Sequence, residues 1–527
     1  MKKNVGLLLI AIMAGAMCAC NDSMDDKKEN GEKVSKYTAP EQAYAAVDAL
    51  YQTGAPAFYG ESTPQDGPPA AMGGFLSGFF DNEAKTEAKL CAYSQQLSID
   101  PTNITDYLDK IWDRAYQSIG MANEVLDNVP YTKELTPQQQ ARLMAESSFF
   151  RAFNYFYLVR AFGGVPLAES SEIASAEDNL PRASLPEVYQ LIVSDLQRSI
   201  PNLPDTAFTD NHFRISRTTA ETLLADVYLT MSGHPLKQDC YKQVAERARE
   251  VINSGKHRLT PNGLTRETSA YNVLRTENLN TEYLYSYRTK ERRADESVAA
   301  LSFSKDATNW GVLKAKRTNN AYQPTRALLN IYDSVYDTRM HEQQFFHTFF
   351  RYEKEGRTVI RTFPHTSYMW FDREAMQETG VSKKDIIIYR YAEVLLIAAE
   401  AIAQSEGVTA EAIGYLADVR ARAYSTTDKN GLIKQLAELD KEKFLEQVWV
   451  ERIREFPFEM KVWTDMQRTR KYPVVNITKE GKTISFRDIV GATNPWGAIF
   501  EEKHLLLPIS QNKLSENALL EQNPGYK

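Results

Sequence analysis

The stretch FRAFNYFYLVRAFGGVPL, residues 150–167, is the most informative part of the sequence. Thr136 and Pro137 begin a helix upstream of it, because Thr is a favoured N-cap residue and Pro fits the first helical turn. Aromatic side chains between Phe149 and Phe162 lie on many sides of this helix, so most of its circumference should be buried. Two glycines, 163–164, end the helix. The stretch predicts a long helix in the core of a helical protein.

Further helices are predicted on both sides of this central one. Apolar residues recur every three or four positions, which is the spacing of one helical face. The predicted helices are 40–51, 107–129, 185–200, 218–231, 241–254, 388–404, 409–424 and 441–470, the last broken at Pro457. Such helices joined by short turns favour antiparallel pairs. Repeated pairs favour a tetratricopeptide-like solenoid, although no clean 34-residue repeat is visible.

Two segments differ from this helical pattern. Residues 54–78 are rich in Gly and Pro and cannot form one helix. Residues 255–384 are rich in Asn, Thr, Arg and Tyr, with a possible strand at 283–287. Loops held on a rigid scaffold are where binding residues concentrate, so both segments are expected on the ligand side.

The predicted organisation is one structural unit with five parts. They are a signal peptide (1–19), a lipidated flexible tether (20–38), an N-terminal helical region (39–254) with a ligand-side loop (54–100), a loop-rich region (255–384) with a candidate ligand loop (288–320), and a C-terminal helical region (385–527).

The first twenty residues are typical of a secretion signal. Lys2 and Lys3 precede an apolar run over residues 5–17, which is shorter than the roughly 20 residues needed to span a bilayer. Cys20 follows the small residue Ala19, as in a bacterial lipobox. We expect cleavage before Cys20 and a lipid anchor on its sulfur. An ordinary signal peptide with an incidental Cys is the alternative.

Charge and motifs exclude several classes of function. The chain has 62 basic and 69 acidic residues, a net charge of −7, which argues against general nucleic-acid binding. No phosphate-binding loop, dinucleotide fingerprint or nucleophile elbow occurs in the sequence. His341 and His347 are six positions apart rather than four, so they do not share a helical face. We expect no catalytic residues, no metal site and no cofactor, and leave a structural cation open.

Two other groups of residues have a structural interpretation. Cys91 and Cys240 are expected to be two buried thiols rather than a disulfide. Glu451, Glu455 and Glu459 follow one another at intervals of four and are interleaved with Arg. Structural ion pairs explain this spacing better than acid–base catalysis does.

Aromatic residues in the loop-rich segments are candidate binding platforms, because sugar rings present flat C–H faces that pack on Trp and Tyr. Trp310 is the first candidate, since it lies in a polar segment beside Gly311, whose backbone could let a ligand approach closely. Packing of Trp310 within its loop is the alternative. Further candidate ligand contacts are Asn309, Tyr287, Arg288, Phe58, Tyr59 and Trp370.

Several segments recur in a characteristic order along the mature chain. They are Cys20, 112–116 with 122–123, 150–167, 225–229, 390–401, 451–465, 507–509 and 522–526. Together they resemble the SusD/RagB family of surface nutrient-binding lipoproteins. The resemblance implies a mainly α fold, in which tetratricopeptide-like helix pairs form a solenoid scaffold that supports a loop-rich ligand-binding region with few short strands.

The same resemblance implies a function without catalysis. Such proteins are anchored by lipid to the outer membrane, face the cell exterior, and capture oligosaccharides for a SusC-like TonB-dependent transporter on which they sit as a lid. A lid for peptides is one alternative, and an extracytoplasmic carbohydrate-active enzyme is another. The ligand-contacting aromatics of the family vary in position, so Trp310 and the other candidates rest on segment composition alone.

Overall fold

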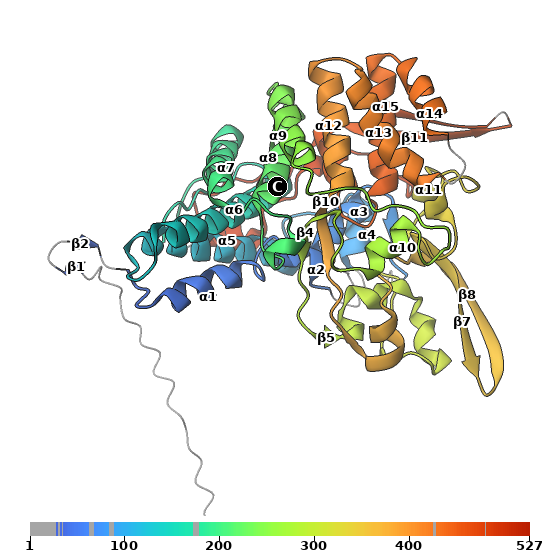
Figure 1. Ribbon diagram of the computed structural model, residues 1–527, viewed down its shortest axis with the longest axis horizontal. Coiled ribbons are helices and arrows are strands. Elements are labelled where there is room, and N and C mark those ends of the chain that lie inside the picture. Colours follow the sequence, from blue (N-terminus) through green and yellow to red (C-terminus); the bar gives the residue numbers. More distant parts are fainter. Residues whose placement is uncertain are drawn as a thin grey trace, which may run out of the picture.

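The computed structural model describes residues 28–29, 32–33, 35–62, 68–83, 89–171, 179–424, 428–479 and 481–527 (Figure 1). The predicted signal peptide, Cys20 and most of the tether lie outside the described residues. The helices are α1 (Pro40–Leu50), α2 (Ala57–Gly60), α3 (Met72–Leu76), α4 (Lys89–Gln95), α5 (Thr105–Asn128), α6 (Pro137–Phe162), α7 (Leu185–Ser199), α8 (Arg217–Ser232), α9 (Tyr241–Asn253), α10 (Ala270–Thr276), α11 (Arg326–Leu329), α12 (Tyr391–Ser405), α13 (Ala410–Ala423), α14 (Lys429–Ala437), α15 (Lys441–Glu455), α16 (Val462–Thr469) and α17 (Gln511–Glu516).

The strands are short and pair two by two. They are β1 (Lys28–Glu29), β2 (Glu32–Lys33), β3 (Phe80–Asp81), β4 (Tyr283–Tyr287), β5 (Arg292–Arg293), β6 (Gln323–Pro324), β7 (Phe346–Lys354), β8 (Arg357–Ser367), β9 (Val381–Ser382), β10 (Ile386–Arg390), β11 (Lys471–Thr478) and β12 (Gly481–Asp488). The described pairs are β1–β2, β3–β6, β4–β10, β5–β9, β7–β8 and β11–β12.

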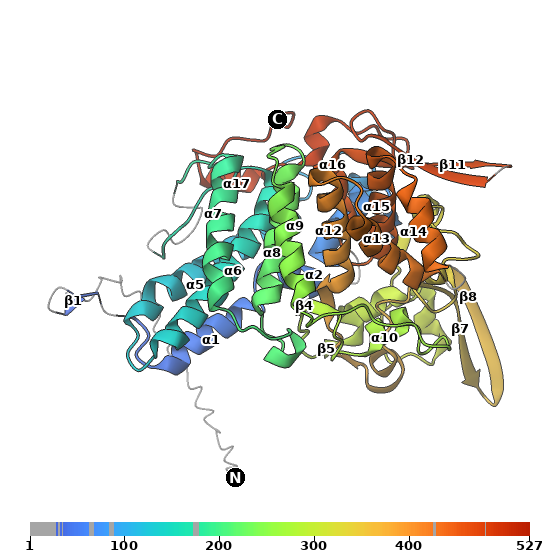
Figure 2. The ribbon, with the colours of Figure 1, turned by 45° about the horizontal axis from the view of Figure 1, so that its top comes forward.

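A row of neighbouring helices forms the body of the molecule. Each of α5, α6, α7, α8 and α9 packs on the next, and α9 then packs on α12, which contacts α13 and α15. Figure 2 shows these helices side by side across the molecule. The chain leaves the row after α9 and returns at α12, so the loop-rich region is inserted between two halves of one scaffold. The predicted solenoid of helix pairs is confirmed.

Helix α6 has the bounds that its sequence predicts. Thr136 and Gln139 form a capping box: the Gln139 amide donates to Thr136 Oγ1 at 3.3 Å, and the Thr136 amide donates to Gln139 Oε1 at 2.9 Å. Gly163 ends the helix with a φ of +79°, a conformation that a side chain would strain. Helices α5 and α7 flank α6, and its aromatic residues are buried as expected.

One predicted helix boundary is wrong. The helix predicted over 388–404 begins at Tyr391, because residues Ile386–Arg390 form β10 and pair antiparallel with β4, the strand expected at 283–287. Ile386 lies opposite Tyr287 in this ladder. Three consecutive β-branched residues favour the extended conformation here, and pairing with β4 selects it over another helical turn.

Two hairpins were not predicted. β7–β8 and β11–β12 project from the same side of the molecule, at the right of Figures 1 and 2. Much of β8 is exposed, and Arg, Lys, Glu and Thr dominate the tip of the β7–β8 hairpin. A two-stranded ribbon exposed along much of its length lacks a strict alternation of apolar and polar residues, so its sequence reads as irregular.

The three regularly spaced glutamates belong to a buried ionic cluster. Its members are Glu282, Asp337, Arg339, Arg390, Arg420, Arg422, Glu451, Glu455 and Glu459. Arg390 Nη1 lies 2.7 Å from Glu455 and 3.0 Å from Glu282, and Arg339 Nη1 lies 2.7 Å from Glu455. These pairs confirm the structural interpretation of the glutamates. They also join the loop-rich region, which carries Glu282 and Arg339, to α15.

Glu459 should make stability depend on pH. Burial raises its pKa to about 7, against the opposing effect of the Arg390 guanidinium, whose Nε lies 2.8 Å from Oε1. The folded protein therefore holds a proton that the unfolded chain has released above about pH 4.5. This contribution to stability is present below pH 4.5 and is lost as the pH rises through 7.

Replacing Glu459 with Gln should remove this dependence. Between pH 5 and pH 8, the free energy of unfolding of Glu459→Gln should gain about 2–3 kcal/mol relative to the wild type. Glu455 does not interfere, because the guanidinium groups around it overcome the effect of burial and lower its pKa to about 2. Urea unfolding of both proteins at four pH values checks this. A constant difference across the range would contradict it.

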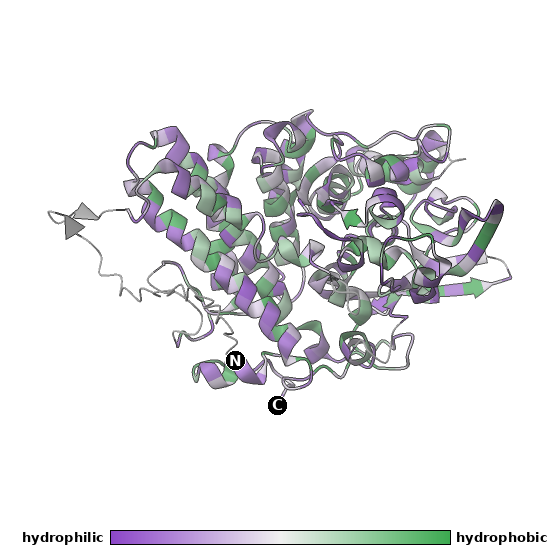
Figure 3. Ribbon diagram, turned by 90° about the horizontal axis from the view of Figure 1, so that it is seen from below, coloured by the Kyte–Doolittle hydropathy of each residue, from purple (hydrophilic) through white to green (hydrophobic). Residues whose placement is uncertain are grey.

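The helices differ in how much of their surface is buried, and α6, α8 and α12 are buried along most of their residues. Figure 3 shows hydrophobic and hydrophilic residues mixed along them. Within the described ranges, no helix combines the length and apolarity required to cross a bilayer. Cys91 and Cys240 are both buried and form no disulfide, as expected.

Candidate ligand-binding site

The two predicted ligand-side loops meet in the structure. Glu83 of the first accepts hydrogen bonds from Ser304 Oγ at 2.7 Å and from the Lys305 amide at 3.2 Å in the second. A Cβ on Gly60 would lie 2.1 Å from the ring of Tyr287, so only glycine permits this contact between α2 and β4. The described residues of the two predicted loop segments are therefore in contact with each other.

Trp310 is packed against other aromatic residues. The residue is only 9% exposed, and its ring stacks on those of Phe350, Tyr352 and Phe363, with centroid distances of 5.8, 6.3 and 5.9 Å. These partners lie on hairpin β7–β8, which covers Trp310. The structure favours the packing alternative for Trp310, because the unpredicted hairpin lies against its ring, and contact of a ligand with Trp310 stays a prediction.

The backbone conformation at position 311 explains why this residue is glycine. Its φ of +74° ends a short helical turn over 305–310, and its missing side chain faces nothing closer than Lys354 Nζ at 4.0 Å. The conformation requires glycine, and the residue needs no ligand to explain it. Asn309, two positions before Gly311, is exposed to solvent, as is Gly311 itself.

The other candidates are mostly engaged in packing. Arg288 pairs with Asp385 at 2.9 Å and lies over the ring of Phe213 at 3.7 Å. Phe58 and Tyr287 are buried in the main core, as is Trp370, which packs on Tyr322 and Phe458. Contact of a ligand with Asn309, Tyr287, Arg288, Phe58 or Trp370 stays a prediction. Tyr59 differs from them, because it lines a cavity.

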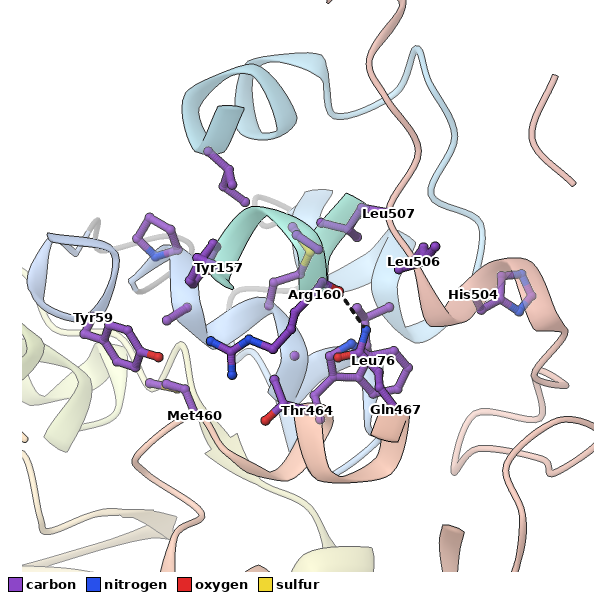
Figure 4. A pocket seen from close by; sticks show the side chains of 17 residues that line it. Tyr59, Leu76, Tyr157, Arg160, Met460, Thr464, Gln467, His504, Leu506 and Leu507 are labelled. Carbon is purple, nitrogen blue, oxygen red and sulfur yellow. Dashed lines mark hydrogen bonds between the residues drawn. The ribbon is translucent and has the colours of Figure 1, made fainter. Parts of the chain in front are cut away.

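This cavity lies where the end of α6 meets α2, α3, α16 and the C-terminal segment. Its volume is about 70 Å³. Tyr59, Tyr157 and Trp463 supply aromatic rings, while Arg160 and Thr464 supply polar groups. Figure 4 shows the Tyr59 hydroxyl, the Arg160 guanidinium and the Thr464 hydroxyl pointing toward the same space. Burial raises the pKa of the Tyr157 phenol, which keeps it a hydrogen-bond donor at neutral pH.

A second, larger cavity adjoins the first. Its volume is about 440 Å³, which is within the range of small-molecule sites. Arg160, Thr464, Gln467 and Leu506 line both cavities. We call the two together the Arg160 cavity. Tyr189 adds another ring to its wall, so aromatic surface borders both parts.

Local hydrogen bonds hold the wall between the two parts. Gln467 Nε2 donates to the carbonyl of Arg160 at 3.2 Å (Figure 4). The same nitrogen donates to the carbonyl of Leu505 at 2.5 Å. Arg160 Nε donates to the carbonyl of Phe156 at 3.0 Å. The end of α6, α16 and the C-terminal segment are thereby fixed around one guanidinium group.

Sequence reasoning missed every member of this site except Tyr59. Trp463 is largely buried, and one part of it lines the cavity. Arg160 lies within the stretch 150–167, from which the sequence predicts only a buried helix. The signal that could have marked it is a charged residue on a helix whose aromatic residues face all directions, since such a charge must enter the interior.

Comparison with known proteins agrees with this architecture. The profile of the SusD family matches residues 353–526, and a profile described as "Starch-binding associating with outer membrane" matches residues 75–229. A SusD superfamily protein of known structure from Parabacteroides distasonis is 27% identical and superposes with a TM-score of 0.79, over 93% of this chain and 100% of that chain. The chain is therefore similar to SusD family proteins over both its N-terminal and its C-terminal helical regions.

Two further proteins are similar to this chain along most of its length. SusD-like protein P2 from Formosa agariphila is 27% identical over 431 residues, which are 79% of this chain and 80% of that protein. Surface glycan-binding protein A from Bacteroides uniformis shares the fold, with 18% identity and a TM-score of 0.67 over 92% of this chain and 99% of that chain. The resemblance to the SusD/RagB family is thus confirmed.

Proposed function

We propose that this SusD-like protein binds oligosaccharides at the cell surface without cleaving them and delivers them to a SusC-like TonB-dependent outer-membrane transporter. The description of the family profile over residues 75–229 and the name of the Bacteroides uniformis relative support carbohydrate as the ligand. A lipid anchor on Cys20 would hold the protein at the outer membrane, facing the exterior.

The Arg160 cavity is the observation that carries the proposal. Sugars need an apolar surface for their C–H faces and hydrogen-bond partners for their hydroxyls. Tyr59, Tyr157 and Trp463 offer the first, and Arg160 and Thr464 offer the second. A peptide would rely more on backbone hydrogen bonds along an extended edge.

A glycan array tests the proposal. Full-length mature protein should bind at least one family of glycans, and a peptide library assayed in parallel should give no signal above background. Binding of peptides with no glycan retained would favour the peptide lid and contradict our choice. Release of reducing ends from a bound glycan would instead indicate an enzyme.

The transporter role has its own test. Mild-detergent extraction of native membranes should yield this protein together with a large outer-membrane barrel, through an interface above the roughly 1,000 Å² of a stable biological contact. Cys20→Ala should leave the membrane fraction. Recovery of the protein alone under conditions that preserve other membrane complexes would argue against the lid role.

A further inference from the structure

Arg160 is a half-buried cation that has no carboxylate partner among the described residues. Over the described ranges, no carboxylate lies at ion-pair distance from its guanidinium, and the side chain makes one hydrogen bond, to the Phe156 carbonyl. The guanidinium carbon lies 3.9 Å from the centroid of the Phe156 ring. Arg151, nine residues earlier on the same helix, differs from Arg160 because it does have a carboxylate partner. It donates hydrogen bonds to both carboxylate oxygens of Asp195 at 2.7 Å.

Asp226, the carboxylate that most affects the pKa of Arg160, does not form an ion pair with it. Burial lowers the pKa of Arg160, and Asp226 together with the phenols around the guanidinium more than offsets this, so the group stays charged. The Asp226 carboxylate instead accepts a hydrogen bond from the Tyr389 hydroxyl at 2.6 Å. Arg160 keeps its charge, while its two terminal nitrogens make no hydrogen bond to a described residue and are available to donate to a bound anion.

The remaining charged groups on the wall are already engaged. Arg468 binds Glu400 at 2.6 and 2.8 Å and also contacts Asp465. Glu502 pairs with Arg470, and Lys503 lies 3.4 Å from Glu501. The two terminal nitrogens of Arg160 therefore offer the cavity an uncommitted pair of charged donors, whose geometry matches an anionic group with two oxygens.

We propose that Arg160 recognises a carboxylate or sulfate group on an acidic saccharide, so that the cavity prefers charged over neutral glycans. This inference rests on the proposed function and specifies the substrate class of the same site. The aromatic rings on both sides of Arg160 would hold the sugar rings, and the guanidinium would fix the register of the charged residue. Leu506, like Arg160, lines both parts of the cavity. Its apolar surface excludes water, which strengthens the interaction between the guanidinium and an anionic group.

Calorimetric titration with four tetrasaccharide probes tests the inference. The probes are tetragalacturonate, its methyl ester, a sulfated galactotetraose and neutral galactotetraose. The wild-type protein should bind one of the two charged probes at least tenfold more tightly than the neutral one. Comparison of the two charged probes shows whether carboxylate or sulfate is preferred. If carboxylate is preferred, the methyl ester should bind like the neutral probe.

Two variants assign the effect to Arg160. Arg160→Met keeps the length of the stem and removes the charge, so it should reduce affinity for the preferred charged probe by roughly thirtyfold, about 2 kcal/mol, without changing affinity for the neutral one. Arg160→Lys should retain part of the preference. Arg198→Met, an exposed charge change on α7, is the matched control and should bind like the wild type.

The outcomes separate this inference from the proposed function. Binding of neutral and charged glycans with equal affinity, or a preference that Arg160→Met leaves intact, would overturn the inference while the glycan-binding function stands. Absence of binding to every glycan, on these probes and on the array, would overturn both. Should Arg160→Met fail to fold, comparison of each charged probe with its neutral counterpart on the wild-type protein still decides whether the cavity prefers charged glycans.

Discussion

Replacing Arg390 with Met should lower the free energy of unfolding by about 3–5 kcal/mol. Arg390 is 1% exposed and contacts Glu282, Glu455 and Glu459 at 3.0, 2.7 and 2.8 Å. Removing the guanidinium leaves these carboxylates buried with less compensating charge. The segment before α12 would also lose its connection to the end of α15.

An exposed ion pair supplies the control for Arg390. Arg266 and Glu267 form a pair at 2.7 Å whose side chains are 50% and 68% exposed. Arg266→Met should change the free energy of unfolding by less than about 0.5 kcal/mol, because surface pairs contribute little. Urea unfolding followed by circular dichroism measures both variants at pH 8. Equal, small effects would show that the ionic cluster does not hold the two regions together.

Replacing Trp310 with Ala should cost about 3–5 kcal/mol of stability and leave glycan affinity unchanged in the folded protein. The ring is the centre of a second core, made with Phe303 and the β7–β8 residues Phe350, Tyr352 and Phe363. Its loss would leave a cavity beneath the hairpin, and the melting temperature should fall.

Asn309→Ala is the matched control for Trp310. Asn309 is exposed on the adjacent position, so its truncation should change stability by less than about 0.5 kcal/mol. Thermal melts and calorimetric titration with the best glycan from the array measure both properties. A Trp310→Ala protein that melts normally but binds its glycan thirtyfold more weakly would restore Trp310 as a ligand platform.

The scaffold was predictable because local rules determine it. The start of α6 follows from a capping box, its end from Gly163, and its burial from the number of aromatic residues around it. Helix pairing follows from helix lengths and short turns. The ion pairs of the glutamates on and after α15 were expected, but their partners Arg339 and Arg390 are too distant in sequence for spacing to reveal.

The ligand-side features depended on contacts between distant segments. Trp310 lies in a polar segment, and only the pairing of β7 with β8 shows that its ring is covered. The Arg160 cavity brings α2, the end of α6, α16 and the C-terminal segment together, and no short stretch of sequence contains two of these elements. Composition of one segment therefore identifies the ligand side better than it identifies the ligand contacts.

A crystal structure of the protein with its tightest oligosaccharide from the array tests the central claim most directly. The claim is that this SusD-like protein binds a glycan in the Arg160 cavity. It predicts a sugar ring against Tyr59, Tyr157 or Trp463, with a polar or charged substituent on the Arg160 guanidinium. A glycan bound instead on the exposed surface near Asn309, with the Arg160 cavity empty of sugar, would contradict it.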